Sequence, residues 1–86
     1  MKNVKYFYLK SCPYCRKADD YIASLCRLNP DYGAIHIERI EESEQPEVAD
    51  KYDYYYVPTF YVDGVKLHEG AATLEKVKAV LDAALK

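Results

Sequence analysis

Two cysteines separated by two residues, Cys12 and Cys15, carry the clearest chemistry in this chain. A pair at this spacing can form a disulfide across one helical turn, hold a metal ion, or divide a redox reaction between an attacking and a resolving thiol. The species that attacks a disulfide is the thiolate and not the thiol. A redox role therefore requires surroundings that stabilise negative charge on one of the two sulfurs.

The segments on either side of the pair predict a junction between a strand and a helix. Val4–Leu9 is rich in β-branched and aromatic residues, which indicates a buried strand within residues 3–9. The segment after the pair predicts a helix over residues 13–28. Cys12 then becomes the N-cap of this helix, and Pro13 takes the first helical position, where its missing N–H costs nothing.

This junction is expected to activate the first cysteine. A helix N-terminus carries unpaired backbone N–H groups and the positive end of the helix dipole, and Lys10, Arg16 and Lys17 add positive charge. Such settings lower the pKa of a cysteine from about 8.5 into the range of roughly 3.5–7.5. We therefore expect Cys12 to attack a disulfide and Cys15, one turn inside the helix, to resolve the mixed disulfide that forms.

Two other uses of the pair, a static disulfide and a zinc half-site, are less favoured. Met1–Lys5 has no apolar signal region and no apolar run is long enough to span a membrane, so we expect a cytoplasmic protein with reduced thiols. A structural zinc site needs four ligands, and Cys26, His36 and His68 form no second close pair. We therefore predict no metal site, and we expect Cys26 to be a buried, inert thiol on the apolar face of the first helix.

Length and composition are those of one small domain. The chain has 86 residues, of which 50% are hydrophobic and 30% charged, so it can build one core over residues 1–86. The net charge of −2 gives no reason to expect nucleic acid or a membrane as a partner. We expect a monomer.

The middle of the chain predicts a turn, a strand and a short helix. Asn29–Gly33 is dense in turn residues and should end the first helix. Residues 34–40 alternate as a strand does. Ser43 is a plausible N-cap for a short second helix that runs to about Tyr52.

The last third predicts a hairpin and a closing helix. Residues 59–62 and 65–69 form two short strands around Asp63-Gly64, a dipeptide typical of a type I′ turn. Thr73 is the expected N-cap of the last helix. The full order, β-α-β-α-β-β-α, predicts a parallel βαβ unit and an antiparallel pair within a four-stranded mixed sheet flanked by three helices.

This order, together with the motif Cys12-Pro13-Tyr14-Cys15 and a later Val57-Pro58-Thr59 that enters the hairpin, resembles the thioredoxin-like fold and most of all the dithiol glutaredoxins. The resemblance covers nearly the whole chain. It implies a thiol–disulfide oxidoreductase with no bound cofactor, acting on disulfide-containing proteins or glutathione mixed disulfides. Sequence alone favours a trans Val57–Pro58 bond, whereas the resemblance implies a cis bond that turns the backbone of Val57 toward Cys12.

The resemblance also implies glutathione as a co-substrate and a set of residues that contact the substrate. Lys10 would meet one carboxylate, the Val57-Pro58 backbone would pair with the cysteinyl part, and the N-terminus of the last helix would hold the other carboxylate. The predicted contact residues are Lys10, Tyr14, Val57, Pro58, Gly70 and Thr73.

Three residues depart from the pattern of the family: Tyr56, Glu69 and Thr73. A negative Glu69 near an anion site is unfavourable for glutathione. The reductant therefore stays open between glutathione and a thioredoxin-reductase-type enzyme. An iron–sulfur or metal carrier that binds through Cys12 is a further alternative.

Overall fold

Four strands and four helices make up the fold, and the computed structural model describes all of residues 1–86. In chain order they are β1 (Val4–Tyr8), α1 (Pro13–Leu28), α2 (Pro30–Gly33), β2 (Ile37–Glu41), α3 (Pro46–Ala49), β3 (Thr59–Val62), β4 (Val65–Glu69) and α4 (Leu74–Leu85).

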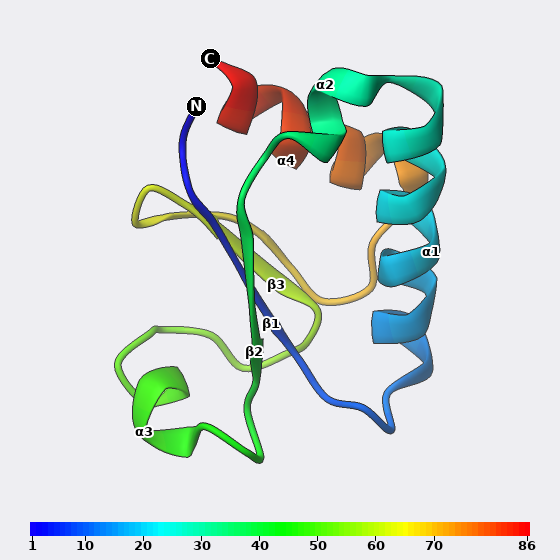
Figure 1. The fold of residues 1–86 in the computed structure, drawn as a ribbon. Coiled ribbons are helices and arrows are strands. Elements are labelled where there is room, and N and C mark those ends of the chain that lie inside the picture. Colours follow the sequence, from blue (N-terminus) through cyan, green and yellow to red (C-terminus); the bar gives the residue numbers. More distant parts are fainter.

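The strands form one mixed sheet in the order β2-β1-β3-β4. β1 and β2 run parallel, joined by the crossover through α1, while β3 is antiparallel to both β1 and β4. The predicted parallel unit followed by an antiparallel hairpin is confirmed. Figure 1 shows β1 at the centre of the sheet, with its carboxyl end leading directly into the loop before α1.

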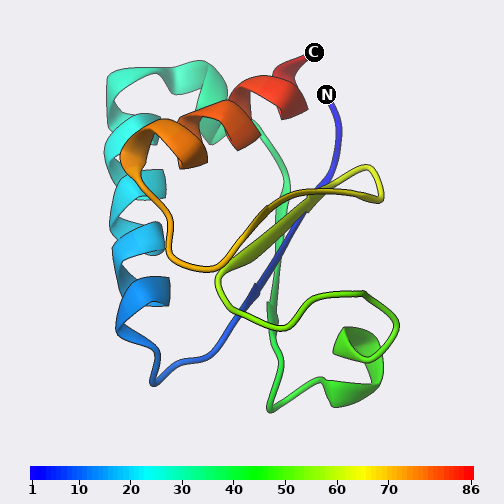
Figure 2. The same ribbon diagram turned by 180° about the vertical axis from the view of Figure 1, so that it is seen from behind.

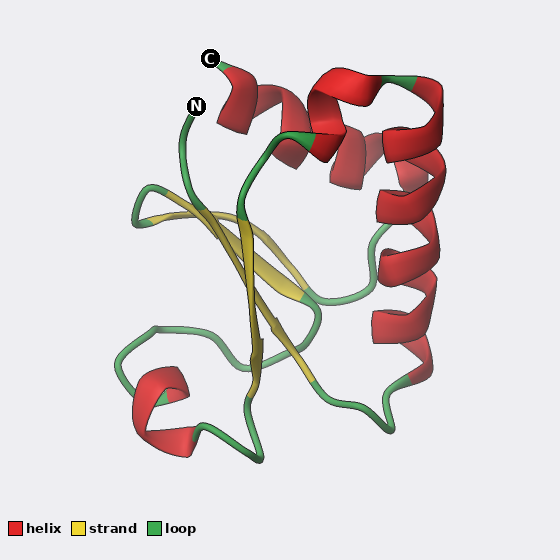
Figure 3. Ribbon diagram, in the orientation of Figure 1, coloured by secondary structure: helices red, strands yellow, loops and turns green.

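Successive residues of β1 point to opposite faces of the sheet and belong to two separate cores. Tyr6 belongs to the larger core, which α1, α2 and α4 cover, whereas Phe7 belongs to a smaller one beside α3. Figures 2 and 3 show the same division, with α1, α2 and α4 on one side of the sheet and α3 on the other. The larger core comprises Val4, Tyr6, Ala18, Ile22, Leu25, Tyr32, Ile35, Phe60, Val62, Val77, Val80, Leu81 and Ala84.

The segment 29–33 was predicted as a turn, and the structure shows the one-turn helix α2 within it. The fold therefore has four helices and not the three that were predicted. The Asn29 side chain accepts a hydrogen bond from the backbone N–H of Asp31 at 3.1 Å, and Pro30 fits the first helical position. The same turn residues thus cap a new helix as well as ending α1. The following strand begins later than predicted, at Ile37.

Ser43 is not the N-cap of the short helix α3, which begins at Pro46 after Gln45. The hydroxyl of Ser43 donates instead to Glu41 Oε1 at 2.6 Å. The side chain that was expected to cap the helix therefore donates a hydrogen bond to the buried carboxylate of Glu41, at the end of β2.

The hairpin and the last helix follow the prediction. Asp63 and Gly64 both have positive φ, 46° and 83°, as a type I′ turn requires. Thr73 caps α4 by accepting the backbone N–H of Lys76 at 3.2 Å. None of the helices has the length and apolar character needed to cross a membrane.

Candidate functional site

Cys12 lies where the loop after β1 meets α1, and it is the N-cap of that helix as predicted. Its backbone is extended (φ −87°, ψ 117°), Pro13 follows in the first turn, and the Cys12 carbonyl accepts the N–H groups of Cys15 and Arg16 at 3.1 and 3.2 Å. The side chain makes no capping hydrogen bond, so its sulfur is not committed to the helix. Both cysteines are free thiols, Cys12 partly exposed and Cys15 1% exposed.

The buried position of Cys15 keeps it protonated. Burial raises the pKa of the Cys15 thiol, and the neighbouring Cys12 sulfur acts in the same direction. The two thiols of the motif therefore differ in exposure and charge. The Cys12 thiol is accessible to another molecule, whereas the Cys15 thiol is buried and neutral.

Polar groups on β1, α1 and β2 anchor the first turns of α1 to the sheet. The Tyr6 hydroxyl donates to the Cys15 carbonyl at 3.0 Å, and the Tyr6 ring stacks on Phe60 with centroids 4.7 Å apart. The Arg39 guanidinium lies over the Tyr6 ring and 3.7 Å from Asp19 Oδ1. Burial raises the pKa of the Asp19 carboxyl, and Oδ1 accepts no hydrogen bond.

The segment before β3 supplies the other wall of the site. The Val57–Pro58 bond is cis, as the resemblance implied, and the Val57 carbonyl oxygen lies 4.0 Å from Cys12 Sγ. Thr59 Oγ1 donates to the Tyr56 carbonyl at 2.5 Å, and the Gly70 N–H donates to the Pro58 carbonyl at 2.9 Å. The backbone of Val57 is thereby presented to the attacking sulfur by contacts on both sides of the cis bond.

The loop before Cys12 is fixed by Glu41, which the sequence prediction did not single out. Glu41 Oε2 accepts the N–H of Lys10 at 3.0 Å, and its other oxygen accepts both the N–H and the hydroxyl of Ser43. The Ser43 hydroxyl and these N–H groups lower the pKa of Glu41 to about 2. The sequence prediction ended this strand at residue 40, whereas β2 includes Glu41 as its last residue, so the prediction gave no signal of this role.

The predicted contact residues fall into two groups. The Gly70 N–H donates to the Pro58 carbonyl, and Gly70 adopts φ 91°, which favours glycine. Tyr14 lies in the first turn of α1 with 54% of its surface exposed. The Lys10 ammonium is paired with Glu44 at 2.5 Å, and the Thr73 hydroxyl is engaged in capping α4. The structure thus places Val57 beside Cys12 and Gly70 against Pro58, and it leaves Tyr14 exposed on α1. It turns Lys10 and Thr73 to partners within the chain.

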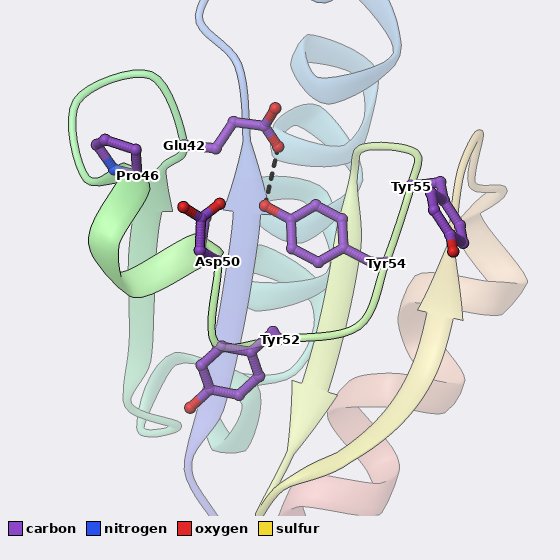
Figure 4. A pocket seen from close by; sticks show the side chains of 7 residues that line it. Glu42, Pro46, Asp50, Tyr52, Tyr54 and Tyr55 are labelled. Atoms are coloured by element: carbon purple, nitrogen blue, oxygen red, sulfur yellow. Dashed lines mark hydrogen bonds between the residues drawn. The ribbon is translucent and has the colours of Figure 1, made fainter.

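A pocket of about 270 Å³ on the α3 side of the sheet contains no cysteine and is separate from this site. Figure 4 shows the Tyr54 hydroxyl directed at Glu42, to which it donates at 2.9 Å. The remaining lining residues are Pro46, Ala49, Asp50, Tyr52 and Tyr55.

The third cysteine, Cys26, is partly buried and not fully buried as predicted, and it packs against the larger core. Its inertness stays a prediction. It shares the continuous helix α1 with Cys15, at a separation of 11 residues. At about 1.5 Å per residue this is roughly 16 Å, too far for a disulfide, which needs Cα atoms within about 7 Å.

The sequence of this chain is similar to those of known proteins. Residues 2–82 match the thioredoxin domain family. The chain is 35% identical over 75 residues, 83% of its length, to protein disulfide isomerase-like 1-4 of Oryza sativa subsp. japonica, and it spans 13% of that relative.

Solved structures share the fold at low identity. Thioredoxin O1 from Arabidopsis thaliana in the oxidised state superposes with a TM-score of 0.74 at 22% identity, covering 100% of this chain and 79% of the other. Fasciola hepatica thioredoxin gives 0.70 at 20% identity, covering 96% and 80%. A malarial protein gives 0.75 at 19% identity, covering 100% and 99%. The predicted thioredoxin-like fold is confirmed.

Proposed function

Because the chain belongs to the thioredoxin domain family of thiol–disulfide oxidoreductases, we propose that it transfers electrons to disulfides through Cys12 and Cys15. One observation carries the proposal. An accessible sulfur at a helix N-cap lies 4.0 Å from the Val57 carbonyl, and a second, buried thiol follows one turn inside the same helix.

The reaction has two exchange steps. The Cys12 thiolate attacks one sulfur of a substrate disulfide, which forms a mixed disulfide and expels the other substrate sulfur as a thiolate that takes a proton from water. The Cys15 thiol then loses its proton and attacks the Cys12 sulfur, which releases the second substrate thiolate and leaves a Cys12–Cys15 disulfide. The second substrate thiolate takes up the proton that Cys15 gives up. The substrate thus gains two electrons and two protons. The dithiol, which starts as one thiolate and one thiol, loses two electrons and one proton, and water supplies the other proton.

The surroundings of Cys15 favour this order. The Cys12 sulfur is one of the groups that raise the pKa of Cys15. Once Cys12 is part of a mixed disulfide it can no longer be an anion, so this contribution disappears and the Cys15 proton is lost more easily. Attack by Cys12 therefore makes deprotonation of Cys15, and so its attack on the mixed disulfide, easier.

The Val57 backbone supports a polypeptide substrate. Its carbonyl faces Cys12, and an extended segment next to the scissile disulfide could pair with it as a neighbouring strand does. The rice relative is named as a protein disulfide isomerase-like protein, which is consistent with disulfides in proteins as the substrates.

Each turnover leaves a disulfide that needs a two-electron reductant. The Cys-Pro-Tyr-Cys motif and its resemblance to glutaredoxins favour glutathione, and the departures at Tyr56, Glu69 and Thr73 favour a thioredoxin-reductase-type enzyme. We propose no resident cofactor. A monomeric, cytoplasmic protein remains our prediction.

Two substrates measured side by side test the function: insulin, and a peptide carrying a mixed disulfide with glutathione. Each is assayed with glutathione and with a thioredoxin reductase as the electron source. We expect turnover of at least one substrate, its loss in Cys12→Ser, and its retention in the matched control Cys26→Ser, because Cys26 packs against the core away from the dithiol. Full activity in Cys12→Ser would show that the mechanism is wrong.

A further inference from the structure

The carboxylate of Glu69, the last residue of β4, is fully occupied by groups of its own chain. Oε2 accepts the consecutive backbone N–H groups of Tyr55 and Tyr56 at 2.5 and 3.0 Å, and Oε1 lies 2.7 Å from the Lys66 ammonium. The Lys66 ammonium and these N–H groups lower the pKa of Glu69 to about 2, so the side chain is an anion at neutral pH.

Two consecutive N–H groups aimed at one oxygen form an anion-binding concavity. With Lys66 beside it, the concavity carries a full positive charge as well as two backbone donors. In this chain the bound anion is an internal side chain. A carboxylate from outside can enter only by displacing Glu69.

This filled anion site adjoins the redox site. Tyr56 directly precedes Val57, whose carbonyl lies 4.0 Å from Cys12 Sγ. Glu69 itself is paired in register with Thr59, which follows the cis proline. A ligand linked to Cys12 and extending along the segment 55–57 would therefore reach Glu69.

The cation on the other side of the dithiol is also paired internally. Lys10, two residues before Cys12, forms its ion pair with Glu44 at 2.5 Å. By contrast, the aromatic rings near the dithiol are free, with 54% of Tyr14 and 71% of Tyr56 exposed. Arg16 and Lys17 in α1 are exposed and form no ion pair, so the helix side of Cys12 keeps positive charge. On the β3 side, the backbone donors of residues 55 and 56 are taken by Glu69.

We propose that Glu69 is a specificity-determining residue that selects polypeptide disulfides over mixed disulfides of glutathione. The inference rests on the proposed function and names its substrate class. Glutathione is a small peptide with two carboxylates, so its recognition depends on anion sites close to the attacked sulfur. A polypeptide segment can instead bind through the Val57 backbone and the exposed tyrosines, and it needs no carboxylate receptor.

Two variants separate charge from geometry. Glu69→Ala empties the concavity and removes the ion pair of Lys66, which keeps its hydrogen bond to the Asp53 carbonyl at 3.2 Å. Glu69→Gln keeps an oxygen acceptor for the N–H groups and removes only the negative charge. The matched control is Glu38→Gln, which changes the same charge at an ion pair with Lys5 in the β1–β2 part of the sheet. The quantity measured is kcat/KM for the glutathione mixed disulfide divided by kcat/KM for insulin.

We expect Glu69→Ala to raise this ratio about tenfold, equal to about 1.4 kcal/mol, mainly through a lower KM for the mixed disulfide. Glu69→Gln should raise it by a smaller factor, and Glu38→Gln should leave it unchanged. An unchanged or lower ratio in Glu69→Gln, with activity on insulin retained, overturns the inference and leaves the proposed function standing. A wild-type protein inactive on both substrates would instead overturn the proposed function.

A binding measurement gives a readout that does not depend on turnover. S-Methylglutathione cannot exchange disulfides, and it can be titrated while the amide resonances of Tyr55 and Tyr56 are followed by NMR. We expect these amides to shift on saturation in folded Glu69→Ala and not in the wild type at the same concentration. Equal shifts in the two proteins, or none in Glu69→Ala, contradict an anion site that Glu69 fills.

Discussion

The hydrogen bond from the Tyr6 hydroxyl to the Cys15 carbonyl, 3.0 Å long and buried, ties the resolving end of the dithiol to β1. Tyr6→Phe removes this bond and keeps the ring, which is fully buried and stacked on Phe60. In a helix the Cys15 carbonyl also accepts an N–H from the following turn, so the substitution leaves no orphaned backbone group. The variant therefore isolates one side-chain hydrogen bond.

The expected cost follows from the net value of such a bond. A neutral intramolecular hydrogen bond contributes about 0.5–1.5 kcal/mol, and we expect the free energy of unfolding to fall by about 1 kcal/mol. For a chain of this size such a change lowers Tm by about 4–8 °C. Urea denaturation should show a lower midpoint with an unchanged slope, because the surface exposed on unfolding hardly changes.

Tyr8→Phe is the matched control, since Tyr8 lies on the same strand and its ring packs 5.3 Å from that of Tyr6. Tyr8 is only partly buried, and its loss of a hydroxyl should change stability by less than about 0.5 kcal/mol. Equal stability of Tyr6→Phe and the wild type, or an equal loss in Tyr8→Phe, would refute the assignment of an anchoring bond to Tyr6.

Three further predictions concern charge and capping. Burial raises the pKa of Cys15, so release of the second thiol in a single-turnover experiment should accelerate with pH, by up to about tenfold per unit while the thiol is protonated; a pH-independent release contradicts this. Because the folded-state pKa of Glu41 is about 2 against an ordinary value of 4.5, its ionised form stabilises the fold above pH 4.5, and this contribution is lost as the pH falls toward 2. Glu41→Gln should flatten the unfolding free energy over that window, as measured by denaturation at each pH. Thr73→Ala removes the cap of α4 and should cost about 1 kcal/mol, whereas Thr73→Ser should cost less.

The parts of the fold with local signals could be predicted from the sequence. α1 has the predicted bounds because a proline at its start and turn residues at its end are short-range determinants. The same holds for β3, β4 and the Asp63-Gly64 turn between them. Each of these depends on residues only a few positions apart.

The features that the sequence did not reveal depend on partners distant in the chain. Glu41 binds Lys10 across 31 positions, and Glu69 binds the N–H of Tyr55 across 14. The sequence placed Glu69 near an anion site and judged it unfavourable for glutathione, but it could not show that Glu69 itself occupies backbone donors. Ser43 is a different case, because the partner of its hydroxyl, Glu41, is only two positions away. The sequence did not show that the Glu41 carboxylate is buried, and that burial depends on the packing of β2 against β1.

The central claim is the division of roles between Cys12 and Cys15, and trapping of the mixed disulfide tests it most directly. Reduced Cys15→Ser and Cys12→Ser are each mixed with the same disulfide-containing peptide, and intact protein mass is measured with peptide mapping of the adduct. We predict a stable adduct on Cys12 in Cys15→Ser and none above background in Cys12→Ser, because the remaining Cys15 is buried and protonated. An adduct on Cys15 that forms as fast in Cys12→Ser as the Cys12 adduct does in Cys15→Ser would contradict the account.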